Sequence, residues 1–302
     1  MTSGLLQIKL PEIFSWPAIM GYLNRTTNEV MYKMIGDKLR RAYKVNGEIY
    51  LCEISPDTNQ EYLQVQILND LKWTDKVKSY ITRHIRDWFD LDTDLTDFYI
   101  KAENDPLLSD LTQNFYGLRL VGMPDFYEAV TWGILGQQIN LTYAYTLKRR
   151  FTEKYGDAIN FEGETYWIYP KPETIVQSTI EDLRQLKLTQ RKAEYLMDIS
   201  RLITTGKMSK AHYQQFQTAK AAEKEMTKVR GIGPWTANYV LMRCLRLGDA
   251  FPMADADIGL LNGIKQIENL DTKPDKERLL SLQKAWGSWS AYATFYIWRL
   301  LY

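Results

Sequence analysis

The chain has 302 residues, of which 45% are hydrophobic and 25% are charged. This composition is that of a globular protein, and the length predicts roughly two domains at about 150 residues each. Lysine and arginine number 38 against 37 aspartate and glutamate, so the formal charge is +1. Such a balance excludes a chain-wide electrostatic attraction to nucleic acid or to an anionic membrane. Any binding of that kind must therefore be local.

Several classes of protein are disfavoured by what the sequence lacks. No apolar run approaches the roughly 18 residues of a spanning helix, and the first residues lack the basic flank and apolar stretch of a secretory signal. We therefore expect a cytoplasmic protein without membrane contact. The two cysteines, Cys52 and Cys244, are too few for a four-thiolate cluster. The two histidines, His84 and His212, argue against a histidine-built metal site.

The N-terminal part mixes strand and helix patterns. Residues 6–10 alternate apolar with polar side chains, as in a half-buried strand, before Pro11 ends the pattern. Ser15 is typical of a helix N-cap, because proline follows in the first turn. Segments 48–54 and 62–67 are rich in Val, Tyr and Ile and predict antiparallel strands.

Helical periodicity dominates from about residue 76 onwards. We predict an α+β protein in which a small α/β domain spans residues 1–105 and a helical body spans residues 106–302. The boundary is placed in the stretch 92–115, which is rich in Asp, Thr and Asn. The periodic stretches are 76–91, 125–155, 190–205, 212–228, 235–246, 258–268 and 277–301.

The most informative motif is a glycine hairpin between two helical patterns, within a helix-hairpin-helix segment at about 215–246. Gly231 and Gly233 flank one apolar residue, which permits positive φ and close approach of another backbone. Pro234 then begins a helix whose exposed amides and positive dipole end suit a phosphate, so we expect Gly231, Gly233 and Thr236 to contact a DNA backbone. The alternative is an ordinary interhelical turn with glycine as the helix stop.

Together with two downstream aspartates, this hairpin resembles the helix-hairpin-helix family of DNA base-excision glycosylases. The aspartates lie in Phe251-Pro-Met-Ala-Asp-Ala-Asp-Ile-Gly-Leu-Leu. The stretches 132–140 and 186–196 also resemble parts of this family, and the stretches 14–23 and 287–298 resemble parts of its bacterial 3-methyladenine DNA glycosylase II branch. For the N-terminal domain, the resemblance implies a unit similar to the TATA-binding-protein repeat.

Two aspartates compete for the catalytic role that the resemblance implies. A carboxylate beside the anomeric carbon can stabilise the developing sugar cation and orient a water molecule. An ungapped count from the hairpin places this carboxylate at Asp255, whereas matching the Asp-apolar-Gly-apolar run places it at Asp257. We favour Asp257, because loops absorb insertions more easily than helix starts do. The alternative for Asp257 is a plain helix cap.

Four aromatic residues fall on positions that line the base pocket in this family. Trp235 and Tyr239 are four residues apart and share a helix face, while Trp298 and Tyr22 match two further pocket positions. Electron-rich rings favour a cationic alkylated base by about 0.5 to 2 kcal/mol per good contact. The alternative for each ring is core packing, since the chain has 9 Trp, 20 Tyr and 10 Phe.

Further matches bear on reaction type and on DNA distortion. Family members that also cut the strand carry a lysine where this chain has Trp235, and neither Lys228 nor Lys192 falls on that position. A monofunctional enzyme that uses water as nucleophile is therefore implied. Gln137 and Gln138 match the residues that fill the gap left by the flipped base, although the branch has an apolar wedge at the second position. The alternative is an exposed helix end.

The resemblance implies a monomeric DNA glycosylase that acts on double-stranded DNA and hydrolytically removes an alkylated purine, 3-methyladenine or 7-methylguanine. It implies no redox or catalytic metal cofactor, and it allows a structural monovalent cation at the hairpin carbonyls. Two alternatives remain open. One is a glycosylase for oxidised or deaminated bases on the same scaffold, and the other is a non-catalytic helix-hairpin-helix DNA-binding module.

Overall fold

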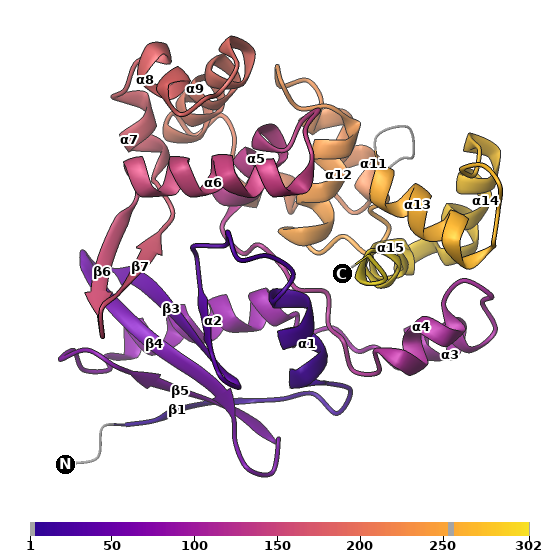
Figure 1. The fold of residues 1–302 in the computed structure, drawn as a ribbon, viewed down its shortest axis with the longest axis horizontal. Coiled ribbons are helices and arrows are strands. Elements are labelled where there is room, and N and C mark those ends of the chain that lie inside the picture. The colour runs from indigo at the N-terminus through magenta and orange to yellow at the C-terminus, as the bar shows by residue number, and fades with distance from the viewer. Residues whose placement is uncertain (1–3, 253–256, 302) are drawn as a thin grey trace.

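The computed structural model describes residues 4–252 and 257–301, in which an N-terminal sheet lies beside a larger helical body (Figure 1). The N-terminal part is the mixed unit expected, and the remainder is mainly helical, so the α+β prediction is confirmed. None of the helices within the described ranges has the length and apolar character needed to cross a bilayer.

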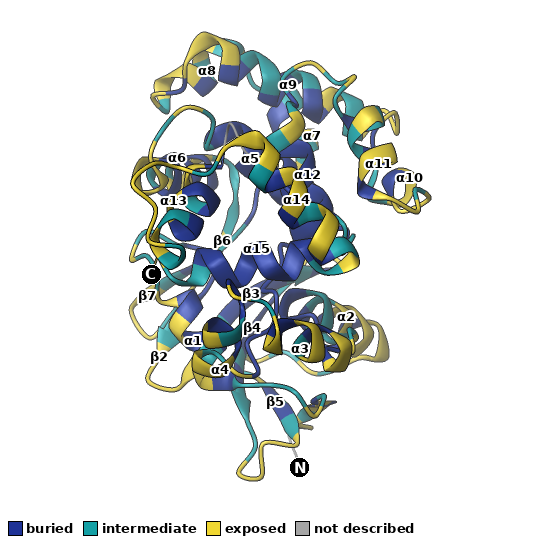
Figure 2. Ribbon diagram, turned by 90° about the vertical axis from the view of Figure 1, so that its right-hand side faces the viewer, coloured by how far each residue is buried: buried dark blue, intermediate teal, exposed yellow. Residues whose placement is uncertain are grey.

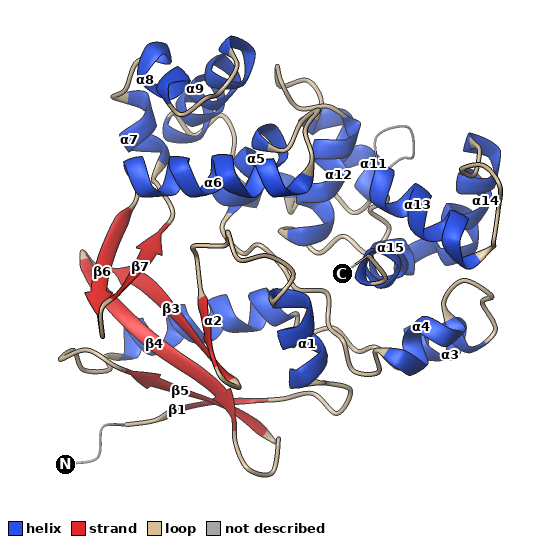
Figure 3. Cartoon of the chain, in the orientation of Figure 1, coloured by secondary structure: helices blue, strands red, loops and turns tan. Residues whose placement is uncertain are grey.

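The sheet is antiparallel, with the strand order β1-β5-β4-β3-β2. Its strands β1, β5, β4 and β3 are labelled in Figure 3. In the hairpin between β3 and β4, Val45 pairs with Glu48 across Asn46 and Gly47, whose φ angles are 53° and 89°. Two successive positive φ angles are typical of the tight turn that matches strand twist. The strands are β1 (Leu6–Lys9), β2 (Lys33–Ile35), β3 (Lys38–Val45), β4 (Glu48–Pro56) and β5 (Tyr62–Ile67).

Two helices belong to the sheet domain, and each begins at a side-chain cap. In α1 (Trp16–Leu23) the Ser15 hydroxyl accepts from the Ala18 amide, and proline occupies the first turn, as the sequence predicts. In α2 (Asp75–Phe89) Thr74 is the cap, and the buried residues recur at helical spacing. This stripe packs against the sheet, with contacts to β3.

The helical body confirms the predicted periodic stretches but divides some of them. The stretch 125–155 is two helices, α5 and α6, because the chain turns at residues 136–140, where Gln138 has a φ of 56°. Helices α5, α12 and α15 form the buried centre of the body (Figure 2). The helices are α3 (Thr96–Glu103), α4 (Ser109–Asn114), α5 (Phe126–Leu135), α6 (Leu141–Tyr155), α7 (Pro172–Val176), α8 (Ile180–Gln185), α9 (Gln190–Thr204), α10 (Lys210–Tyr213), α11 (Ala219–Met226), α12 (Pro234–Arg243), α13 (Ile258–Ile267), α14 (Lys276–Trp286) and α15 (Ser290–Arg299), with a 3₁₀ turn at Gly287–Trp289.

Two features of the body differ from the sequence expectation. The stretch 92–115 is not a plain linker, because it contains α3 and α4, and the predicted division after residue 105 falls between them. A hairpin of β6 (Asp157–Phe161) and β7 (Glu164–Ile168) interrupts the helices and reaches the sheet (Figure 3). There Tyr166 joins Ala42 and Leu51 in a small separate core. The hairpin thus braces the body against the sheet domain.

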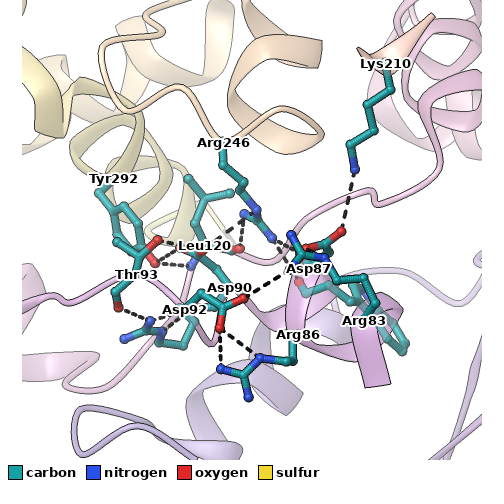
Figure 4. A network of polar contacts seen from close by, with 12 residues as sticks. Arg83, Arg86, Asp87, Asp90, Asp92, Thr93, Leu120, Lys210, Arg246 and Tyr292 are labelled. Atoms are coloured by element: carbon teal, nitrogen blue, oxygen red, sulfur yellow. Dashed lines mark hydrogen bonds and ion pairs between the residues drawn. The ribbon is translucent and has the colours of Figure 1, made fainter. Parts of the chain in front are cut away.

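A polar network provides a second connection between the two parts, around the C-terminal end of α2 (Figure 4). Arg246, in the loop after α12, donates to the Leu120 carbonyl at 2.6 Å and to the Asp87 carbonyl. The Tyr292 hydroxyl of α15 donates to the Asp90 carboxylate. Buried polar groups that satisfy one another in this way fix the relative position of the elements that carry them.

Candidate active site

The glycine hairpin connects α11 with α12, where the sequence predicts it. Gly231 has a φ of 93°, and a Cβ at this position would lie 2.5 Å from Cγ of Tyr195. Both the backbone conformation and the lack of space therefore require glycine. Between the two glycines, the side chain of Ile232 is buried and anchors the turn. The hairpin is consequently a rigid turn that packs against the Tyr195 side chain of α9.

The hairpin presents the N-terminus of α12. Gly233 is the N-cap and Pro234 lies in the first turn. The helical ladder starts with the Ala237 amide, which donates to the Gly233 carbonyl at 2.9 Å. The amides before it point out of the helix end, as an anion site requires. The Thr236 side chain is buried against Gly133 instead, so only its backbone amide is placed to meet a phosphate.

Asp257 stands at the N-terminus of α13 and is only 4% exposed. Its Oδ1 accepts from the Leu260 amide at 2.7 Å, so it is the helix cap considered in the sequence. Two indole nitrogens also donate to the carboxylate, Trp298 to Oδ1 and Trp235 to Oδ2, each at 3.1 Å. The capping role therefore accompanies direct contact with two predicted pocket residues. Asp255 lies outside the described residues.

The surroundings of Asp257 favour a strong electrostatic effect. Burial raises the pKa of its carboxyl above the ordinary value, while the hydrogen bonds from Leu260, Trp235 and Trp298 act in the opposite direction. A charge in a site that excludes water acts on a nearby cation more strongly than one in bulk solvent. The arrangement can therefore stabilise a positive charge that develops next to the carboxylate.

The three predicted pocket residues of the helical body lie together around this acid. The rings of Trp235 and Tyr239 stack with centroids 5.3 Å apart and planes at 26°. Those of Tyr239 and Trp298 are 6.2 Å apart at 30°. Stacked rings in proteins are themselves about 4.5 to 7 Å apart, so this spacing leaves no room for a further ring between Tyr239 and Trp298.

Tyr22 comes from α1 and brings the sheet domain to the same site. Its ring packs on Phe295 with centroids 4.7 Å apart. The guanidinium of Arg243 lies 5.6 Å from the Tyr22 ring and 5.4 Å from the Tyr239 ring, so it connects the two predicted pocket residues. Sequence reasoning missed Arg243. The available signal was its position one turn after Tyr239, on the same face of α12.

The two glutamines of the turn between α5 and α6 differ in their contacts. The Gln137 amide nitrogen donates to the Gly231 carbonyl at 2.8 Å and so supports the hairpin. That carbonyl, one of those expected to be available to a monovalent cation, therefore already accepts one hydrogen bond. Gln138 is exposed and has left-handed backbone geometry, with φ at 56°. Of the two, Gln138 is the side chain presented to solvent at the tip of the turn.

Lys192 and Lys228, which do not fall on the position of the family's lysine nucleophile, contact other groups. The Lys192 ammonium donates to the Leu135 carbonyl at 2.7 Å and closes the C-terminal end of α5. Lys228 pairs with Glu225 at 2.6 Å on the surface. Within residues 4–252 and 257–301, no group of three or more His, Cys, Asp and Glu side chains could hold a metal ion.

Comparison with known proteins identifies the family of this chain. A model of the HhH-GPD superfamily base excision DNA repair proteins matches residues 131–288, and the 8-oxoguanine DNA glycosylase N-terminal domain model matches residues 14–130. The chain is 45% identical over 301 residues to the DNA-3-methyladenine glycosylase of Bacillus subtilis (strain 168), covering 99% of this chain and 98% of that protein.

Two further comparisons involve more distant proteins. The DNA-3-methyladenine glycosylase 2 of Escherichia coli (strain K12) is 26% identical over 182 residues, 60% of either chain. The fold is similar to that of the 3-methyladenine DNA glycosylase from Archaeoglobus fulgidus, with a TM-score of 0.82 at 22% identity over 97% of this chain and 96% of that one. The resemblance seen in the hairpin and the aspartate loop is therefore confirmed, and the chain belongs to the HhH-GPD superfamily of base excision DNA repair proteins.

Proposed function

We propose that this protein is a monofunctional DNA glycosylase that removes alkylated purines, 3-methyladenine and 7-methylguanine, from double-stranded DNA as a monomer. The observation that carries the proposal is the buried Asp257 carboxylate, which accepts hydrogen bonds from the indoles of Trp235 and Trp298 beside the Tyr239 ring. The names of the Bacillus subtilis and Escherichia coli relatives support the substrate class.

The chemistry follows from the charges that appear as the glycosidic bond breaks. The C1′–N bond of a flipped nucleotide cleaves, its electron pair leaves with the base, and the sugar becomes an oxocarbenium cation. The Asp257 carboxylate stabilises this cation, and a water molecule then attacks C1′. An alkylated purine is already cationic and leaves as a neutral base, so the enzyme has to supply only part of the barrier reduction.

The aromatic rings provide discrimination for such a base. A cation over Trp or Tyr gains about 0.5 to 2 kcal/mol per good contact. Trp235, Tyr239 and Trp298 supply these contacts within reach of Asp257. Because Trp235 occupies the position of the lysine found in strand-cutting family members, water is the nucleophile and no Schiff base forms.

The hairpin binds the DNA backbone. The amides of Gly233 and Thr236 at the start of α12 donate to phosphate oxygens, and Gly231 sets the close approach. Gln138, exposed at its turn, enters the gap left by the flipped base, while Gln137 holds the hairpin in place.

Direct release of bases tests the proposal. Duplex DNA treated with a methylating agent should release 3-methyladenine and 7-methylguanine, with no strand cleavage and no protein–DNA adduct after borohydride reduction. Preferential release of an oxidised base would contradict the substrate class. A borohydride-trapped adduct would contradict the monofunctional mechanism, and the absence of release from any damaged DNA would favour a non-catalytic binding module.

The hairpin assignment predicts the effect of Gly231→Ala. The new methyl group collides with the Tyr195 ring and the residue is held at a φ of 93°, so the hairpin must shift. We expect affinity for lesion-containing DNA to fall at least tenfold in a fluorescence anisotropy titration. Gly206→Ala is the control, because Gly206 has a φ of 72° but nothing within 4 Å of the added methyl. Equal losses of affinity in the two variants would show that backbone strain alone, and not the hairpin position, is responsible.

A further inference from the structure

Six charged side chains line a small, partly open cavity between the sheet domain and the helical body. The cavity measures about 20 Å³, room for about one water molecule. The charged side chains come from the segment after α1, from β3 and from α5, α6 and α12. Four of them are cationic and two are carboxylates, so the cavity wall carries two uncompensated positive charges. They are Arg25, Glu29, Arg41, Glu128, Lys148 and Arg243.

The carboxylates lie with two of the four cations. The Lys148 ammonium is 3.1 Å from Glu29 and 2.8 Å from Glu128, and Arg41 is 3.8 Å from Glu128. The hydrogen bonds of Arg25 reach neutral oxygens instead, the Tyr22 carbonyl at 3.0 Å and the Tyr145 hydroxyl at 2.5 Å. The excess positive charge is therefore concentrated at Arg25 and Arg243.

Both of these guanidinium groups lie against rings of the proposed base pocket. Arg25 is 4.0 Å from the centroid of the Tyr22 ring. Arg243 is 3% exposed and lies over the rings of Tyr22, Tyr239 and Phe295 at 5.4 to 5.6 Å. Within the described residues, its buried Nε has no hydrogen-bond partner.

Such a charge is costly to bury, and a guanidinium does not escape the cost by losing its proton. A permanent positive charge therefore lies behind the rings of the proposed base pocket.

This charge affects the leaving group of the reaction. When a neutral purine such as hypoxanthine departs, the C1′–N9 bond breaks, its electron pair stays on the base, and the base becomes an anion that later takes a proton from water. An alkylated cationic purine departs neutral. A positive charge behind the pocket stabilises the departing anion and repels the cation that an alkylated base presents before cleavage.

We propose that Arg243, together with Arg25, is a specificity-determining residue that extends base release from cationic alkylated purines to neutral deaminated purines. The inference rests on the proposed function. Arg243 acts across the Tyr22 and Tyr239 rings, without touching the base. A unit charge buried at this range from the base is expected to change the relative rates by about tenfold.

The test compares kcat/KM for duplexes that contain one hypoxanthine or one 7-methylguanine. Arg243→Met should lower hypoxanthine release about tenfold more than 7-methylguanine release, and Arg243→Lys, which keeps the charge, should restore most of the ratio. Arg25→Gln should shift the ratio in the same direction and serves if Arg243→Met fails to fold. Arg41→Gln is the control, because Arg41 lines the same cavity but lies over Tyr43 and Trp88, away from the pocket rings. It should shift the ratio less than Arg243→Met.

The outcomes separate this inference from the proposed function. An equal loss of both activities in Arg243→Met and Arg25→Gln would show a purely structural role and overturn the inference. So would a wild-type protein that releases 7-methylguanine but not hypoxanthine. A wild-type protein that releases neither base would overturn the proposed function, and the inference with it.

Discussion

Asp257→Asn is expected to lower the rate of base release by about a thousandfold while the protein stays folded and binds DNA. Asparagine is as good an N-cap as aspartate, so its side-chain oxygen can still accept from the Leu260 amide. What the variant loses is the negative charge next to the developing sugar cation. If the amide NH₂ of the new side chain takes the place of Oδ2, it cannot accept the hydrogen bond that the Trp235 indole donates there.

Single-turnover release of 7-methylguanine from a methylated duplex measures this effect. Asp275→Asn is a matched control, because Asp275 caps α14 through the Arg278 amide at 2.8 Å but is exposed to solvent. It should leave the rate unchanged. Asp255→Asn should be assayed in parallel. If that variant loses activity and Asp257→Asn does not, the catalytic assignment passes to Asp255.

Lys148→Met should destabilise the protein by about 3 to 5 kcal/mol. Lys148 is 2% exposed and lies between Glu29 and Glu128, which are themselves buried. Burial raises the pKa of Glu29, but the Lys148 charge, the hydrogen bonds from the Met31 amide and Lys148, and the Arg25 charge together outweigh burial and hold that pKa below the ordinary value. Removal of the ammonium leaves two carboxylates without their shared partner in a medium that solvates them poorly.

Urea unfolding at neutral pH measures the change in the free energy of unfolding. Lys44→Met is the control, because its pair with Asp157, at 2.7 Å, also connects the sheet with the body but is partly solvent-exposed. That variant should cost about 1 kcal/mol or less. The stabilisation from a lowered carboxyl pKa is lost as pH falls through that pKa, so the gap between wild type and Lys148→Met should narrow in acid. Equal losses in the free energy of unfolding for the two substitutions would show that burial of the Lys148 ion pairs adds nothing to stability.

The parts of the site that lie close together in sequence were predictable. Gly231, Gly233 and Asp257 fall within 27 residues, and helical periodicity on either side placed the hairpin and the start of α13. The pairing of Trp235 with Tyr239 followed from the four-residue spacing on one helix. Such features depend on local geometry, which the order of residues determines directly.

Contacts between distant segments were not predictable in this way. Lys148 and Glu29 are 119 residues apart, and Gln137 reaches the Gly231 carbonyl across 94 residues. Helical periodicity shows that a face is buried but not which charge will meet it. The β6–β7 hairpin did leave a local signal, since Gly163 stands between two short segments rich in Ile, Phe, Tyr and Trp. The predominance of helical patterns on both sides obscured it.

The indole hydrogen bonds to Asp257 bear on when the protein commits to a nucleotide. Each carboxylate oxygen is occupied by an N–H, and the adjacent rings are packed too closely to receive another. The proposed role of Asp257 therefore implies that an arriving base meets these rings before its deoxyribose faces the acid. On this proposal, undamaged nucleotides that bind the rings poorly would be rejected on entry, before the glycosidic bond is exposed to the acid.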